Sequence, residues 1–208
     1  MKMTLAAVVL ATVAATPAPR AASMDLLARA TDPNPTLDSY TAMAQLSALM
    51  HAVIPIHKTF PGAVYYLRPH RKIEFQGVPG PLSQFRDLAS TTPTYEQAMQ
   101  QYAITPLTDD GTLSTYSLVP KKTGGRVKNV VVKINDVSAL LDSAQWNYTN
   151  GGTLKFQQTY ANVGIYRLPA KATIDAHFPG YSVDGTLTFS NYKPNATVSP
   201  SIFASPSS

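Results

Sequence analysis

The chain has 208 residues, of which 14% are charged, 44% are hydrophobic, 17 are proline and none is cysteine. This length suits one domain, or at most two small ones, with a proper hydrophobic core. The hydrophobic content excludes a disordered polyelectrolyte. The missing cysteine excludes disulfides, thiolate nucleophiles, cysteine-ligated metals and a lipid-modified N-terminal cysteine. The net charge of +5 permits an anionic partner but does not indicate a nucleic-acid binder.

Residues 1–15 have the composition of a secretory signal peptide. Lys2 provides a positive start, Thr4 to Ala15 carry no charge, and a proline-rich exit follows. The apolar stretch is too short for a transmembrane anchor. A buried N-terminal helix is the alternative, but the exit composition favours export. We expect a soluble mature domain of residues 16–208 in a bacterial periplasm.

The next segment predicts a short helix followed by a long strand. Ser23 is suited to cap a helix over 24–30, which the run Asp32-Pro33-Asn34-Pro35 ends. From Tyr40 to Ala52 the even positions are apolar or small and most odd positions are polar. This period of two predicts a strand, with a helix as the alternative because Ala, Met and Leu favour helices.

Turn residues and helical spacings mark the middle of the chain. Pro61-Gly62 predicts a turn, with strands over 63–68 and 71–78. Residues 82–102 have helical spacings and predict a helical insertion, whose second helix Thr94 is suited to cap.

The rest of the chain predicts several antiparallel strands. Glycine-containing turn dipeptides separate runs with strand-like composition. These runs are Leu113–Val119, Val127–Ile134, Leu140–Tyr148, Thr153–Val163, Ala172–Ala176 and Thr186–Tyr192. The fold class is therefore mainly β with a few helices, in a closed or half-closed meander.

The motifs of common enzymes are missing from the sequence. It has no G-x-S-x-G, H-E-x-x-H, P-loop or dinucleotide-binding motif. The four histidines (His51, His57, His70 and His177) are irregularly spaced and no acidic cluster accompanies them. We expect no enzyme activity, no metal and no cofactor. An exported hydrolase with an unrecognised site remains a further hypothesis, and a histidine meeting a carboxylate and a hydroxyl in a cavity would indicate it.

Two basic clusters and many aromatic residues suggest binding functions. The clusters are Arg68-His70-Arg71-Lys72, and Lys121-Lys122 with Arg126 and Lys128. The second brackets Gly124-Gly125, as expected at a hairpin tip, where it is either a solvated turn or a contact for anionic headgroups or a membrane partner. Eleven tyrosines, seven phenylalanines and six methionines could line a concave sheet around an apolar ligand, or simply form a core.

Four segments, in the same order, resemble a known family. They are the GAVYYLRP run of 62–69, the strand, proline-lysine turn and strand of 116–134, and the segments 150–163 and 190–203. They are similar to the LolA/LolB-like superfamily of periplasmic outer-membrane lipoprotein carriers. The resemblance implies a half-open antiparallel β barrel whose helical lid encloses an apolar cavity for acyl chains. It also implies that Arg68 points inward and helps to hold the lid closed. The helical insertion at 82–102 departs from the family pattern and leaves the cargo open.

We therefore expect a non-enzymatic carrier for lipoprotein acyl chains or another lipid-like cargo. The expected partners are this cargo and an inner- or outer-membrane protein, with no nucleic acid. The expected ligand-binding residues are Leu46, Met50, Val64, Tyr66, Arg68, Val130, Val132, Phe156 and Tyr160. The expected docking residues are Lys121, Lys122, Arg126 and Lys128. The alternative is an envelope protein-binding or structural β module without internal cargo, which a filled core of Tyr66, Phe156 and Tyr160 would favour.

Overall fold

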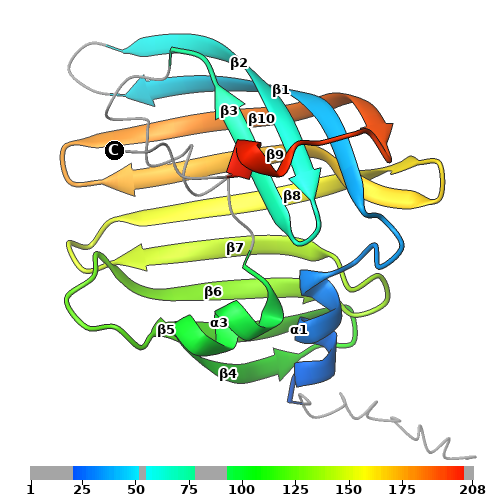
Figure 1. Cartoon of the computed structure of the whole chain (residues 1–208). Helices are drawn as coiled ribbons and strands as arrows, with labels where there is room; N and C mark the ends of the chain where they lie inside the picture. Colours follow the sequence, from blue (N-terminus) through cyan, green and yellow to red (C-terminus); the bar gives the residue numbers. More distant parts are fainter. Residues whose placement is uncertain (1–20, 52–54, 78–92, 204–208) are drawn as a thin grey trace, which may run out of the picture.

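A computed structural model describes residues 21–51, 55–77 and 93–203 (Figure 1). The signal peptide predicted over 1–15 and the part of the predicted insertion before residue 93 lie outside the described residues. The strands are β1 (Ser39–His51), β2 (Ile56–Leu67), β3 (His70–Phe75), β4 (Tyr102–Asp109), β5 (Leu113–Pro120), β6 (Val127–Asn135), β7 (Leu141–Tyr148), β8 (Thr153–Val163), β9 (Tyr166–Phe178) and β10 (Tyr181–Pro194). The helices are α1 (Met24–Thr31), α3 (Tyr95–Gln101) and the 3₁₀ turn η1 (Pro200–Phe203).

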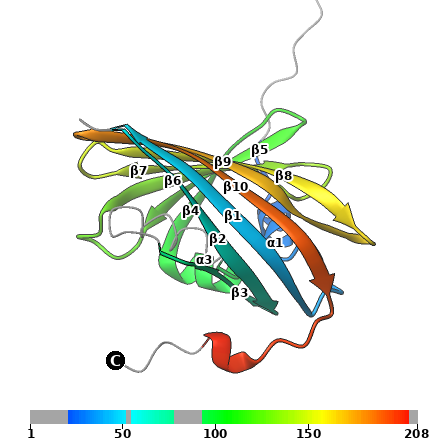
Figure 2. The ribbon, with the colours of Figure 1, turned by 90° about the horizontal axis from the view of Figure 1, so that it is seen from above.

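The strands form one antiparallel sheet in the order β3-β2-β1-β10-β9-β8-β7-β6-β5-β4. Its edges, β3 and β4, do not pair with each other, so the barrel is open on one side. The sheet is strongly curved, and α1 and α3 lie on its concave side (Figures 1 and 2). This confirms the predicted fold class, a mainly β, half-open antiparallel barrel with helices over its inner face.

The alternation of apolar and polar residues in β1 reflects a strand with one buried face, as predicted. In β1 the even positions from Tyr40 to Ala48 are buried, whereas Met43 is 54% exposed. Tyr40 lies opposite Tyr66 of β2, and Leu46 lies opposite Leu187 of β10. Burial of one face therefore outweighs the helix propensity of Ala, Met and Leu.

The same face continues across the whole sheet as its concave lining. Residues directly opposite one another on neighbouring strands lie on one face. One such row, from β9 to β5, is Ile174, Phe156, Ala144, Val132 and Tyr116. Another, from β3 to β1, is Ile73, Val64 and Ala42. The core therefore lies on the inner side of the sheet.

Helix α1 covers one end of this inner face. The hydroxyl of Ser23 caps it by accepting a hydrogen bond from the Asp25 N–H, as predicted. Its buried Leu26 and Leu27 pack in a cluster with Tyr116 of β5. The Tyr116 hydroxyl donates to the carbonyl oxygen of Ser23, which fixes the start of the helix on the sheet.

Helix α3 confirms the second predicted helix of the insertion. Thr94 and Gln97 form a reciprocal capping box at its start. Ala98 is buried, and the helix leads directly into β4. The strand β4 was not predicted, because Pro106 and irregular polarity over 102–109 obscure the period of two.

The predicted turn at Pro61-Gly62 is wrong, because both residues lie inside β2. The carbonyl oxygen of Pro61 accepts a hydrogen bond from the N–H of Gln76, which lies just beyond the end of β3. Proline has no N–H, and this position is tolerated because the regular pairing of β2 with β3 ends here. Gly62 is required instead because there is no room for a side chain at this position. A Cβ atom there would lie 2.7 Å from Cδ1 of Phe75 and 2.9 Å from the carbonyl oxygen of Glu74.

Candidate ligand-binding cavity

The concave face holds a cavity with two lobes. The larger lobe, of about 1490 Å³, lies between β3, the helices and strands β4 to β7. The smaller lobe, of about 690 Å³, lies beside the connection between α1 and β1. Ala30, Thr31, Pro69, Arg71, Pro93 and Leu141 line both lobes. The two lobes are therefore adjacent parts of one hollow.

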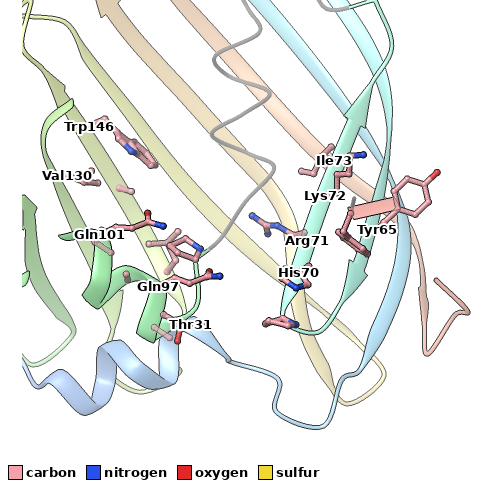
Figure 3. A pocket seen from close by; sticks show the side chains of 18 of the residues that line it. Thr31, Tyr65, His70, Arg71, Lys72, Ile73, Gln97, Gln101, Val130 and Trp146 are labelled. Carbon is pink, nitrogen blue, oxygen red and sulfur yellow. The ribbon is translucent and has the colours of Figure 1, made fainter. Parts of the chain in front are cut away.

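The larger lobe has a mostly apolar wall on the side of the sheet. Side chains from four strands line it, namely Ile104, Leu118, Val130, Val132 and Trp146. Figure 3 shows Val130 and Trp146 on one side of the cavity and the β3 side chains on the other. Arg71 points from β3 into this space, whereas Tyr65 points away from it.

Most of the predicted ligand-binding residues line one of the lobes. Val130 and Val132 line the larger lobe, and Tyr66, Arg68, Phe156 and Tyr160 line the smaller one. Leu46 and Val64 are instead buried in the core, 3% and 1% exposed, and Met50 packs against that core. These three share the inner face but do not line the cavity.

Arg68 ties the end of β2 to the connection between α1 and β1. Its guanidinium donates hydrogen bonds to the carbonyl oxygens of Asn34, at 2.8 Å, and Leu37, at 3.0 Å. It also donates to a carboxylate oxygen of Asp32 at 2.9 Å. The side chain thus holds the segment that joins the helix over the cavity to the sheet.

Tyrosines surround the smaller lobe. The ring of Tyr40 stacks on Tyr66, with centroids 5.0 Å apart, and meets Tyr192 edge-on at 5.4 Å. Burial raises the pKa of all three phenols. Burial also raises the pKa of Tyr160 to about 12. These phenols are therefore neutral at physiological pH.

The predicted docking residues lie at the tip of the hairpin between β5 and β6. Lys121, Lys122, Arg126 and Lys128 are all exposed. Lys121 also has a structural contact, because its ammonium group donates to the carbonyl oxygen of Met99 in α3 at 2.7 Å. The tip is thus joined to a helix that borders the cavity.

The polar arrangements that could suggest catalysis lie outside the cavity. His51 contacts Asp184 at 2.8 Å and His177 contacts Asp175 at 2.7 Å, on exposed strand surfaces. His70 does line the larger lobe, but its ring lies against that of Phe203 and forms no hydrogen bond with a carboxylate or hydroxyl among the described residues. No group of three potential metal ligands occurs in the described part of the chain. Neither α1 nor α3, nor any other helix in the described ranges, has the length and hydrophobicity required to span a bilayer.

Several cavity residues were missed in the sequence. Arg71 was grouped with its neighbours as a basic cluster, although Lys72 lies on the opposite face and pairs with Glu74. Trp146 and Leu118 lie in predicted strands but were not assigned to the cavity. The strand alternation contains the signal: Arg71 lies opposite Tyr66, and Trp146 lies opposite Val130.

Comparison with known proteins adds a structural relationship. No protein-family model and no curated protein matches the chain. A LolA superfamily protein from Nitrosomonas europaea is similar over 87% of this chain and 96% of its own, with a TM-score of 0.52 at 13% identity. An outer-membrane lipoprotein-sorting protein domain from Vibrio parahaemolyticus is similar over 86% and 94%, with a TM-score of 0.56 at 12% identity. The chain has a LolA-like fold.

A third solved structure extends this relationship. A DUF1329 family protein from Desulfovibrio piger is similar over 86% of this chain and 95% of its own, with a TM-score of 0.53 at 12% identity. The three similarities cover 86–87% of this chain, so the LolA-like fold extends over most of it. At these identities the similarity establishes the fold.

Proposed function

We propose that this LolA-like protein is a non-enzymatic periplasmic carrier that binds lipoprotein acyl chains or another lipid-like cargo. The observation that carries the proposal is the apolar larger lobe of about 1490 Å³. This volume exceeds the range of roughly 300–1,000 Å³ that is usual for small-molecule pockets. A long or multiply acylated ligand suits it, and each CH₂ group removed from water contributes about 0.8 kcal/mol.

The arrangement of the aromatic side chains supports a carrier over a structural module. A module without cargo is expected to fill its interior with Tyr66, Phe156 and Tyr160 packed on one another. Instead, the three side chains are only partly buried and line the smaller lobe. These side chains therefore border a cavity, whereas a structural module would have a filled core at this place.

The only tryptophan in the chain provides a direct assay, because Trp146 lines the larger lobe. We expect a brominated fatty acid to quench its fluorescence, since bromine quenches by contact. Leu118→Gln places an uncompensated amide in the lobe and is expected to weaken quenching. Val119→Gln is the matched control, because Val119 is the next residue of β5 and is 46% exposed.

Two results bear on the proposal. Mass spectrometry of gently purified protein is expected to detect bound lipid, and the N-terminus of periplasmic material is expected near Thr16. Unquenched Trp146 in a lipid-free protein would contradict the carrier function. Equal quenching in the Leu118 and Val119 variants would place the bound lipid elsewhere.

We also propose that the basic hairpin tip docks the carrier at an anionic membrane surface or membrane partner for cargo release. Lys122 and Arg126 are exposed there, and such residues contribute about 1 kcal/mol each near an anionic bilayer. The double variant Lys122→Glu, Arg126→Glu is expected to slow transfer of a fluorescent fatty acid to phosphatidylglycerol vesicles while leaving its binding unchanged. Lys155→Glu, an exposed change on β8, is the control. Equal transfer rates for the wild type, the double variant and the Lys155 variant would contradict the docking role of the hairpin tip.

A further inference from the structure

The cavity has a polar end, and Arg71 marks it. Arg71 lies on β3 directly opposite Tyr66 of β2, so both side chains lie on the inner face of the sheet. Its side chain points into the cavity in Figure 3 and lines both lobes. A guanidinium thus lies at the junction between the apolar larger lobe and the smaller lobe.

Neutral hydrogen-bonding groups accompany this guanidinium in the smaller lobe. Tyr40, Tyr66, Tyr160 and Gln158 line the lobe together with Arg71. Burial raises the pKa of the Tyr40 phenol, and the positive charge of Arg71 lies near enough to oppose this larger effect by lowering it. A phenol hydroxyl and an amide can each donate a hydrogen bond to an anion. The group therefore combines a planar cationic donor with neutral donors on one wall.

The described residues that line each lobe carry a net charge of +1. The described residues of the smaller lobe include Arg68, Arg71 and Arg167 against Asp32 and Glu96, which gives 3 − 2 = +1. Those of the larger lobe include Arg71 and Lys72 against Glu74, which gives 2 − 1 = +1. Two ion pairs, Arg68 with Asp32 and Lys72 with Glu74, link most of these charges locally. Arg68 and Lys72 thus partly balance the charges of Asp32 and Glu74.

We propose that the cavity selects an anionic amphiphile, whose carboxylate or phosphate is bound by Arg71 beside the tyrosines while its acyl chain lies in the larger lobe. This inference rests on the proposed carrier function and specifies its cargo. The planar fork of an arginine matches the two oxygens of a carboxylate or phosphate, and such charge-assisted bonds are stronger than neutral ones. The apolar wall of Val130, Leu118 and Trp146 provides the site for the chain.

Displacement of a neutral fluorescent probe, N-phenyl-1-naphthylamine, tests the headgroup preference. The competitors are laurate, lauryl phosphate and lauryl alcohol, whose hydrocarbon chains have the same number of carbon atoms, together with inorganic phosphate and acetate. For the wild type we expect laurate and lauryl phosphate to compete about tenfold more strongly than lauryl alcohol. We expect inorganic phosphate and acetate not to displace the probe, because they lack the chain.

Two variants locate the preference. Arg71→Gln is expected to remove it by weakening the anionic competitors to the level of the alcohol, while Arg71→Lys retains part of it. Lys155→Gln is the matched control, because this exposed cation on β8 lines neither lobe and its replacement is expected to leave the preference unchanged. Circular dichroism checks that each variant is folded, and the wild-type comparison remains decisive if Arg71→Gln does not fold.

The possible results separate the two proposals. Equal competition by the alcohol and the anions would overturn the headgroup selection and leave the carrier function standing. A preference that survives Arg71→Gln would also overturn it. Binding of inorganic phosphate as strong as that of lauryl phosphate would show a site for free anions rather than for an amphiphile. If no acyl compound displaces the probe or binds by any other assay, the carrier function itself fails.

Discussion

Replacing Arg68 by leucine tests whether this side chain holds the cavity closed. In Arg68→Leu the bonds to the carbonyl oxygens of Asn34 and Leu37 and to the Asp32 carboxylate are lost. The backbone bond from Arg68 N–H to the Asp38 carbonyl stays in place. The change therefore removes the side-chain tether of residues 32–38 and leaves the end of β2 paired.

The contacts allow an estimate of the effect. Each bond from the charged guanidinium to a carbonyl contributes about 1 kcal/mol at a partly exposed site, and the exposed ion pair contributes less than about 1 kcal/mol. The sum of about 2–3 kcal/mol corresponds to roughly a 30- to 150-fold rise in the opening of the segment. The same energy lowers global stability, but a fold that is stable by about 5–15 kcal/mol remains almost fully populated.

Hydrogen exchange followed by mass spectrometry measures this opening over residues 32–38. The amides of Asp32 and Leu37 are hydrogen-bonded in the folded protein and are expected to lose protection. If the opening controls release, the rate at which a fluorescent fatty acid leaves the protein rises by a similar factor.

Arg167→Leu provides a matched control for this experiment. Arg167 is exposed and binds Asn34 of the same segment only through its own backbone N–H and carbonyl. Its replacement is expected to leave hydrogen exchange over residues 32–38 unchanged, because both of its bonds to Asn34 are made by the backbone. Equal exchange in the Arg68 and Arg167 variants would refute the tether, and equal cargo retention in Arg68→Leu and the wild type would refute its role in release.

Two further predictions concern stability. Gly62→Ala is expected to lower the free energy of unfolding by about 1–3 kcal/mol, because its Cβ meets Phe75 and a backbone carbonyl below 3.0 Å. Gly125→Ala, where nothing lies within 4 Å, is expected to change it by less than about 1 kcal/mol, and equal urea midpoints for both variants would contradict the packing argument. Stability is also expected to fall as the pH rises from about 10 to about 12, because an unfolded tyrosine ionises near pH 10 and Tyr160 near 12. At about pH 11 this difference amounts to about 1.4 kcal/mol, and Tyr160→Phe should reduce the fall in denaturant titrations.

Much of the fold follows from the alternation of side chains along the strands. The even positions of residues 40–48 predicted a strand despite unfavourable propensities, and their burial accounts for it. Tyr66, Phe156 and Tyr160 were among the expected ligand-binding residues, and the strand register brings them around the smaller lobe. Period-two patterns are informative here because one face of each strand is buried.

The remaining features depend on contacts between distant segments. Gly62 indicates a turn by composition, but its role is set by Phe75 of the neighbouring strand. The difference between Arg71 and Lys72 likewise depends on which face of β3 looks inward, and that face is fixed by pairing with β2. A local cluster of basic residues does not contain this information. The volume left between the helices and the sheet also depends on how strongly the sheet curves, which no single strand specifies.

The pairing of β1 with β10 has a consequence for how the domain folds. The other neighbours in the sheet follow one another along the chain, whereas Tyr40 lies opposite Pro194 across most of the sequence. During synthesis, residues 39–75 are complete long before β10, the strand with which β1 must pair. Such long-range pairing forms slowly, and β3 can face β4 to β7 across the cavity only once β1 has paired with β10. The hollow between β3 and β4 to β7 is therefore completed only after β10 has been synthesised.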